Sequence, residues 1–179
     1  KPVLLASGAA TIGDVQRAVK TVLPINHELV LMQCNTNYTA ADENFDHIHL
    51  RVLETYKAMF SNVVLGLSDH THGHATVLGA VALGARVVEK HFTDDNDRVG
   101  PDHKFAMNPK TWAEMVVNTR QLERALGSGN KVVAGNEHDT VVVQQRCVRT
   151  NREIHPGEEI TRDMLKVLRP NTPGSIKPY

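Results

Sequence analysis

The chain has 179 residues, of which 41% are hydrophobic and 22% charged, which is typical of a globular protein with room for one domain and a small module. Its 20 basic residues balance its 20 acidic ones, which excludes the broad positive surface that a nucleic-acid-binding or membrane-surface protein needs. The longest apolar runs are far shorter than the roughly 20 residues that a membrane-spanning helix requires.

Short apolar segments alternate with helical patterns along most of the chain. We predict four strands, at residues 3–6, 29–32, 63–67 and 86–88. The helix after the first strand begins at Thr11, because Thr11 and Asp14 suit a capping box, and it ends at Pro24. Four successive βα units imply parallel strands joined by right-handed crossovers.

Three further helices are predicted. The second helix, residues 43–60, has one apolar face, formed by Ile48, Val52, Tyr56 and Met59. The third, residues 75–83, is small and apolar, which predicts tight packing. The fourth begins at the Asn108-Pro109 pair, a cap followed by a first-turn proline, and stops near Gly127.

Polar residues stand where each predicted strand ends. They are Ser7, Asn35, Thr36, Ser68, Asp69, His70, Lys90 and His91. Functional groups at the carboxyl ends of the strands are typical of the (β/α)8 barrel, although doubly wound sheets share the tendency. We therefore predict an α/β fold in which residues 1–128 form the C-terminal half of a TIM (β/α)8 barrel, with a small open sheet as the alternative.

The composition changes after the fourth helix. Glycines and polar residues at 129–140 predict a linker. The three valines at 141–143 together with Cys147-Val148 predict a strand, and residues 167–169 predict another. We therefore predict a second, small β-rich module over residues 141–179.

His70 and His91 are the candidate metal ligands. They follow consecutive predicted strands, one βα unit apart, so both imidazoles are expected at the mouth of the same barrel. Neutral imidazole is a common ligand for Zn, Mn and Fe, and two histidines leave positions open for water and substrate. The alternative is that these are ordinary solvated histidines, since the chain has 10 of them.

The cysteines and the first residues bear on the protein's setting. Cys34 and Cys147 have neither disulfide-framework nor metal-ligand spacing, and a reducing cytoplasm is the simplest setting for them. The chain opens directly in a predicted strand, without a leader or a starting Met, so we expect it to be a piece of a longer protein.

Several motifs occur in order along the chain. They are Gly-Leu-Ser-Asp-His-Thr at 66–71, Ala-Val-Ala-Leu-Gly-Ala at 80–85, Glu-Lys-His-Phe-Thr at 89–93 and Gly-Pro-Asp-His at 100–103. In these motifs the chain resembles the sialic acid (nonulosonic acid) synthase family. The Cys34 to Tyr38 run occupies the place of that family's Cys-Thr-x-x-Tyr motif, and the tail, with Gly157-Glu158 and Arg169-Pro170, resembles its antifreeze-like (SAF) domain.

The resemblance implies a reaction and a cofactor. A family member condenses phosphoenolpyruvate with the aldehyde of an N-acyl hexosamine, such as N-acetylmannosamine or its phosphate, to give a sialic or nonulosonic acid and phosphate. A divalent ion, Mn²⁺ in the first place and otherwise Co²⁺ or Mg²⁺, would be held by His70 and His91 and would polarise the aldehyde. Carbon 3 of phosphoenolpyruvate attacks that aldehyde, water adds to carbon 2, and phosphate leaves.

The resemblance also implies substrate ligands. Ser68 would hydrogen-bond phosphoenolpyruvate, with Asn35 and Thr36 as further ligands on the preceding strand end. Tyr38 would line the sugar pocket, and Asp102 would bind sugar hydroxyls and act with the histidines in catalysis. Each has a purely structural alternative: loop capping for Asn35 and Thr36, a turn position for Asp102, and rim packing for Tyr38.

Arg169 extends the implied site beyond one subunit. In the family the matching arginine belongs to the antifreeze-like domain and contacts the acyl-amino group of the sugar in the active site of the other subunit. The resemblance therefore implies a domain-swapped homodimer. An arginine before a proline is otherwise unremarkable.

The chain departs from the family pattern in two respects. Its first motif reads Ala6-Ser7-Gly8 where the family has Ser-Thr-Gly, so Ser7 is the candidate substrate ligand at this strand end. The family's first four βα units have no counterpart in this chain. A half-barrel leaves strand edges unpaired, so we expect the chain alone to be incomplete as an enzyme.

Two other functions remain open. Another metal-dependent barrel enzyme, such as an aldolase or isomerase acting on a sugar phosphate, could use the same two strand-end histidines. Alternatively, the chain could be a non-catalytic carbohydrate-binding or assembly fragment. Dependence on phosphoenolpyruvate separates the synthase from the aldolase, and dependence of metal binding on the histidines separates it from the fragment.

Overall fold

The computed structural model describes residues 1–179, and its contacts divide the chain into two units, Lys1–Gly127 and Ser128–Tyr179. The domain boundaries drawn from the sequence stay a prediction. No helix in the chain combines the length and the apolar character needed to cross a membrane.

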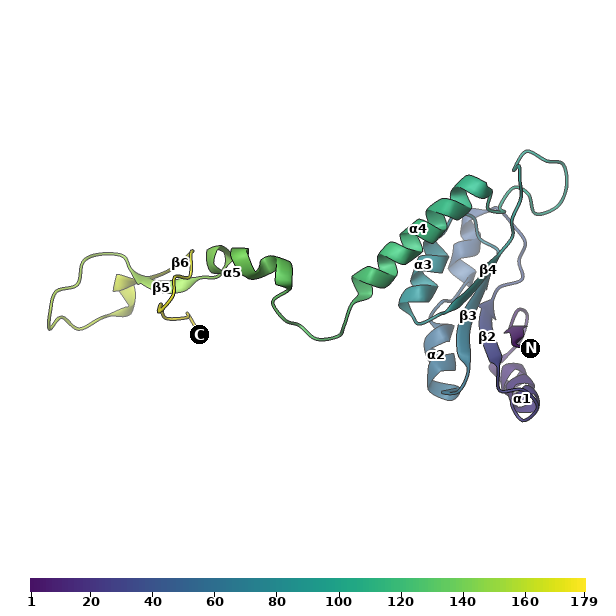
Figure 1. The fold of residues 1–179 in the computed structure, drawn as a ribbon, viewed down its shortest axis with the longest axis horizontal. Helices are drawn as coiled ribbons and strands as arrows, with labels where there is room; N and C mark the ends of the chain where they lie inside the picture. The colour runs from purple at the N-terminus through teal and green to yellow at the C-terminus, as the bar shows by residue number, and fades with distance from the viewer. The chain divides into compact units, whose positions relative to one another are not determined.

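A four-stranded parallel sheet organises the first unit. Its strands are β1 (Val3–Ala6), β2 (Leu29–Cys34), β3 (Val64–Asp69) and β4 (Val87–Lys90), and they lie in the order in which they occur in the chain (Figure 1). Every neighbouring pair is parallel. This is the order of successive βα units in a barrel, and the sheet is a curled half-barrel, as the strand ends predicted.

Four α-helices follow the strands. They are α1 (Ile12–Val22), α2 (Val52–Met59), α3 (Ala75–Ala82) and α4 (Pro109–Leu126). The predicted starts of α1 and α4 are confirmed, because Thr11 and Asn108 both form capping boxes with the residue three positions later. Helix α2 packs on β2 and β3, whereas α3 packs on β3 and α4.

The single helix predicted over residues 43–60 is wrong. The structure has a short 3-10 helix, η1 (Asp42–His47), and a separate α2. His49 lies between them with φ at 49°, a left-handed conformation that interrupts a right-handed helix. The predicted apolar face is also altered, because Leu53 is fully buried while Met59 is 37% exposed.

The core lies between the sheet and the helices. Strand β2 is buried along its whole length, and β3 is buried from its second residue onward, as expected of parallel strands covered on both faces. Strand β1 alternates between half-buried and exposed residues, which is typical of an edge strand. The residues at the carboxyl ends of β2 and β3 are therefore held by well-packed strands.

The second unit contains a two-stranded antiparallel sheet of β5 (Cys147–Thr150) and β6 (Leu165–Leu168). Three short helical segments accompany it: η2 (Gly135–Glu137), α5 (His138–Gln144) and η3 (Arg162–Met164). The strand predicted at residues 141–143 is wrong, because these residues lie within α5. Helix α5 begins directly after η2, so the β propensity of three valines does not decide the conformation here.

Candidate functional site

His70 and His91 lie side by side at the carboxyl edge of the sheet. Each follows the last residue of its strand, and those last residues, Asp69 and Lys90, are register partners. The ring centroids of the two histidines are 5.1 Å apart and the ring planes are inclined by 67°. This separation lets both imidazoles reach one ion at the ~2.1 Å typical of metal–nitrogen bonds.

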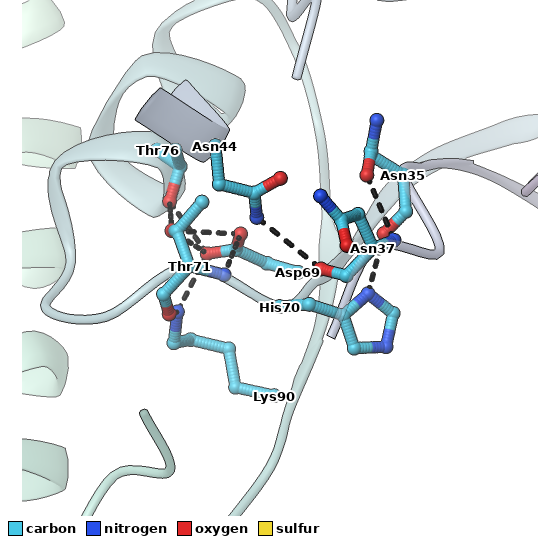
Figure 2. Close-up of polar contacts among 8 residues, drawn as sticks. All are labelled: Asn35, Asn37, Asn44, Asp69, His70, Thr71, Thr76 and Lys90. Atoms are coloured by element: carbon cyan, nitrogen blue, oxygen red, sulfur yellow. Dashed lines mark hydrogen bonds and ion pairs between the residues drawn. The ribbon is translucent and has the colours of Figure 1, made fainter. Parts of the chain in front are cut away.

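Each imidazole has an oxygen next to its Nδ1 atom. In His70, Nδ1 lies 2.7 Å from the carbonyl oxygen of Asn35, so this nitrogen carries the proton and donates it (Figure 2). In His91, Nδ1 lies 3.4 Å from Oδ2 of Asp102. Metal-binding histidines typically have such partners, because a donor role for Nδ1 leaves the Nε2 lone pair free for the ion.

No group of three or more His, Cys, Asp or Glu side chains is arranged to hold a metal ion. The donor set at this edge is therefore the two imidazoles. An ion bound by two protein ligands keeps several coordination positions for water or substrate, which is a property of catalytic rather than structural sites.

Aromatic rings surround the two histidines. The Tyr38 ring centroid is 4.3 Å from that of His70 and 5.6 Å from that of His91, in edge-to-face arrangements. The ring centroid of the buried Phe105, which lies in the loop before α4, is 5.2 Å from that of His91. Tyr38 itself is 54% exposed, so it stands at the rim of the site.

Asp102 is placed next to His91 by an unusual backbone conformation. Its φ is 71°, in the left-handed region that Asp and Asn tolerate better than other side chains. Asp102 thus has the left-handed backbone of a turn residue, and it also lies beside His91. Its carboxylate is within reach of His91 and is partly exposed to solvent.

Of the other predicted ligands, Ser68 lies on β3, Ser7 directly follows β1, and Asn35 and Thr36 directly follow β2. Ser68 is buried in β3 as the register partner of Cys34. Ser7 donates its hydroxyl to the Met32 carbonyl at 2.9 Å. Asn35 donates its amide to the His47 carbonyl at 3.1 Å, and its side-chain oxygen accepts from the Asn37 N–H.

A cavity of about 540 Å³ has Ser7 and Asn35 in its lining but neither His70 nor His91. Thr36 is exposed and packs over Gly8, where an added Cβ would lie 2.2 Å from its Cγ2 atom. Arg169 belongs to the second unit, directly after β6, and its role at a sugar site stays a prediction. The structure thus brings together Tyr38, His70, His91 and Asp102, and it holds Ser7 and Asn35 in a neighbouring cavity.

Sequence reasoning missed a buried ion pair behind the histidines. Nζ of Lys90 lies 2.6 Å from Oδ2 of Asp69, and the two side chains are 1% and 0% exposed (Figure 2). Burial lowers the pKa of the Lys90 ammonium, and the neighbouring Asp69 carboxylate opposes that shift. The sequence does show that both strands end in a charged residue. Charged side chains are rarely buried unless they are paired, so two opposite charges at neighbouring strand ends could have suggested this ion pair.

Comparisons with known proteins agree with this geometry. The sequence model of the NeuB family matches residues 1–131. The chain is 34% identical over 176 residues to the N,N'-diacetyllegionaminic acid synthase of Legionella pneumophila, which covers 96% of this chain and 48% of that protein. It is 33% identical over 167 residues to the N-acetylneuraminate-9-phosphate synthase of Homo sapiens, covering 93% of this chain and 46% of that one.

A solved structure gives the same result. The N-acetylneuraminic acid synthetase of Leptospira borgpetersenii, in complex with citrate, superposes with a TM-score of 0.69 at 28% identity, covering 78% of this chain and 48% of that one. The chain spans about half the length of the curated relatives it matches. Because the family model matches well over half of the chain, the chain belongs to the NeuB family.

Proposed function

We propose that this chain supplies the metal-binding half of a sialic-acid-type synthase, which condenses phosphoenolpyruvate with the aldehyde of an N-acyl hexosamine. The observation that carries the proposal is the convergence of His70 and His91, whose Nδ1 atoms both face oxygen atoms. The relatives named as legionaminic and N-acetylneuraminate-9-phosphate synthases support the class of product.

The two imidazoles would hold a divalent ion, with Mn²⁺ as the first candidate and Co²⁺ or Mg²⁺ as alternatives. When bound, the ion would supply a Lewis acid for the carbonyl oxygen of the acceptor. The two imidazoles fit such an ion, because neutral nitrogen ligands suit first-row divalent metals and the ring centroids are 5.1 Å apart.

The protein's own residues would orient the acceptor and the histidines. Asn35 fixes the His70 ring through its backbone carbonyl, and Asp102 stands beside the His91 ring. Tyr38 and Phe105 place aromatic surface beside the imidazoles, against which the apolar face of the acceptor would pack. Asp102 is partly exposed, so its carboxylate is also able to accept hydrogen bonds from sugar hydroxyls.

Phosphoenolpyruvate would bind on the preceding strand ends, with Ser68 as a hydrogen-bond donor. Asn35, Thr36 and Ser7 are the other proposed ligands. Both the Asn35 amide and the Ser7 hydroxyl are engaged with backbone carbonyls, so each would have to exchange that partner to donate to the phosphate or carboxylate. Arg169 is proposed to reach the acyl-amino group of the sugar from the other subunit of a domain-swapped homodimer.

Phosphate release tests the proposed reaction. The full-length protein with Mn²⁺ is offered phosphoenolpyruvate together with a panel of N-acyl hexosamines and their phosphates, and products are identified by mass spectrometry. We expect phosphate release only when both substrates are present, together with a new 2-keto acid that retains the acceptor's carbons. Cleavage or isomerisation of a sugar phosphate without phosphoenolpyruvate would instead support the aldolase or isomerase alternative.

A further inference from the structure

Asp69 and Lys90 directly precede the two histidines and are opposite each other in the β3–β4 ladder. Successive side chains of a strand point to opposite faces of the sheet. Asp69 accordingly reaches the first turn of α3, where it accepts a hydrogen bond from Thr76, whereas His70 contacts the ring of Tyr38. The ion pair therefore lies behind the histidines, on the helix side of the sheet.

Asp69 and Lys90 form hydrogen bonds to each other and to Thr71, and Asp69 also accepts one from Thr76 (Figure 2). Lys90 donates both to Asp69 and to the Thr71 carbonyl, at 2.6 Å in each case. Asp69 also accepts from the Thr71 N–H at 3.0 Å and from the Thr71 hydroxyl at 2.9 Å. These bonds tie β4 to the end of β3, to the loop after β3, and through Thr76 to α3.

The Asp69–Lys90 pair constrains the register of β3 against β4, and therefore the positions of His70 and His91. A buried ion pair often stabilises a fold no more than well-packed apolar residues would, because both charges lose their hydration. It does discriminate between strand registers, since a shift of β4 by one residue would separate the charges and turn His91 to the opposite face. The two charges and the two imidazoles thus depend on the same register.

We propose that the Asp69–Lys90 ion pair is a positioning device that fixes the register of β3 against β4 so that His70 and His91 converge on one divalent ion. This inference rests on the proposed function, because it concerns the same metal site. Asp69 and Lys90 act through the histidines and do not touch the substrate.

The test is the Mn²⁺ affinity of the full-length protein carrying Asp69→Asn together with Lys90→Met. The double substitution removes both charges at similar volume, whereas either single change would leave an unpaired buried charge. We expect near-UV circular dichroism like that of the parent and a Mn²⁺ dissociation constant raised about 10- to 100-fold, as for other residues that orient metal ligands. Free Mn²⁺ is followed by electron paramagnetic resonance.

Two controls separate the possible outcomes. The matched variant Arg120→Met with Glu123→Gln removes an exposed ion pair on α4 and should leave the affinity unchanged. Thr76→Val removes the hydroxyl that bonds both Asp69 and Thr71 without changing a charge, and it should weaken Mn²⁺ binding in a folded protein even if the double variant does not fold. Parent-like affinity in folded Thr76→Val, or in the folded double variant, would overturn the positioning role. If the parent bound Mn²⁺ no better than His70→Ala, the proposed metal site itself would fail.

Discussion

At the scale of single residues, the two histidines differ in how they are held. His70 is buried, and its Nδ1 proton is bound by a backbone carbonyl, which substitution of a side chain does not remove. His91 is 25% exposed and relies on the carboxylate of Asp102. We therefore expect the orientation of His91 to be the more sensitive to mutation of its surroundings.

Asp102→Asn tests that dependence without disturbing the backbone. Asn tolerates the left-handed conformation of residue 102 as Asp does, so the turn should be preserved. Loss of the carboxylate should lower turnover about 10- to 100-fold, the range found for partners of metal-binding histidines, with an unchanged melting temperature. Asp97→Asn, an exposed change in the same loop, is the control. Equal turnover in both variants would assign Asp102 to the turn alone.

At the scale of elements, the sequence predicted those parts of the fold that depend on local signals. All four strands of the first unit were located, because short apolar runs bounded by polar residues mark buried parallel strands. The caps of α1 and α4 were found because Thr11 and Asn108 make their bonds within three residues. The adjacency of His70 and His91 followed from the strand order.

The errors arise where the backbone departs from the conformation that the local residue pattern favours. The interruption at His49 and the helix at residues 141–143 each run against local propensity, and periodicity carries no information on either. The Asp69–Lys90 pair was missed for a different reason. Which face a strand-end residue occupies depends on the pairing register between β3 and β4, and one sequence without coordinates does not specify that register.

Asn108→Ala tests the role of α4's first turn. The Asn108 side chain accepts from the Thr111 N–H and donates to Asn96 in the loop after β4, so it joins the helix to the loop that carries Asp102. Loss of an N-cap of this kind costs about 1 kcal/mol and at most about 2. Urea unfolding should show this loss, and Lys110→Ala, an exposed change in the same turn, should not. A stability equal to the parent's would mean that the cap is replaced by water.

At the scale of the whole molecule, the chain presents one half of a barrel and a small second unit, and it spans about half of its curated relatives. Strand β1 is an edge of the sheet, with Leu4 55% exposed. An unpaired, partly apolar edge is unfavourable in water, so we expect β1 to pair with a further strand in the active enzyme.

A mixed-subunit experiment tests the proposed shared site. His70→Ala and Arg169→Ala proteins, each of which we expect to be inactive alone, are unfolded together, refolded and assayed. If Arg169 serves the other subunit, a mixed dimer has one site with an intact His70 and an intact Arg169, and activity should return to about a quarter of the parent's, as random pairing of equal amounts predicts. No recovery would place Arg169 in its own subunit's site or outside any site.

The convergence of His70 and His91 on one ion is tested most directly by pulsed electron paramagnetic resonance of the full-length protein loaded with Mn²⁺. Hyperfine coupling counts the histidine nitrogens bound to the metal. We expect two such nitrogens in the parent and one in either His70→Ala or His91→Ala, with no change in His74→Ala, whose imidazole is hydrogen-bonded to Asn118 instead. A parent spectrum with no histidine nitrogen, or one unaffected by both substitutions, would contradict it.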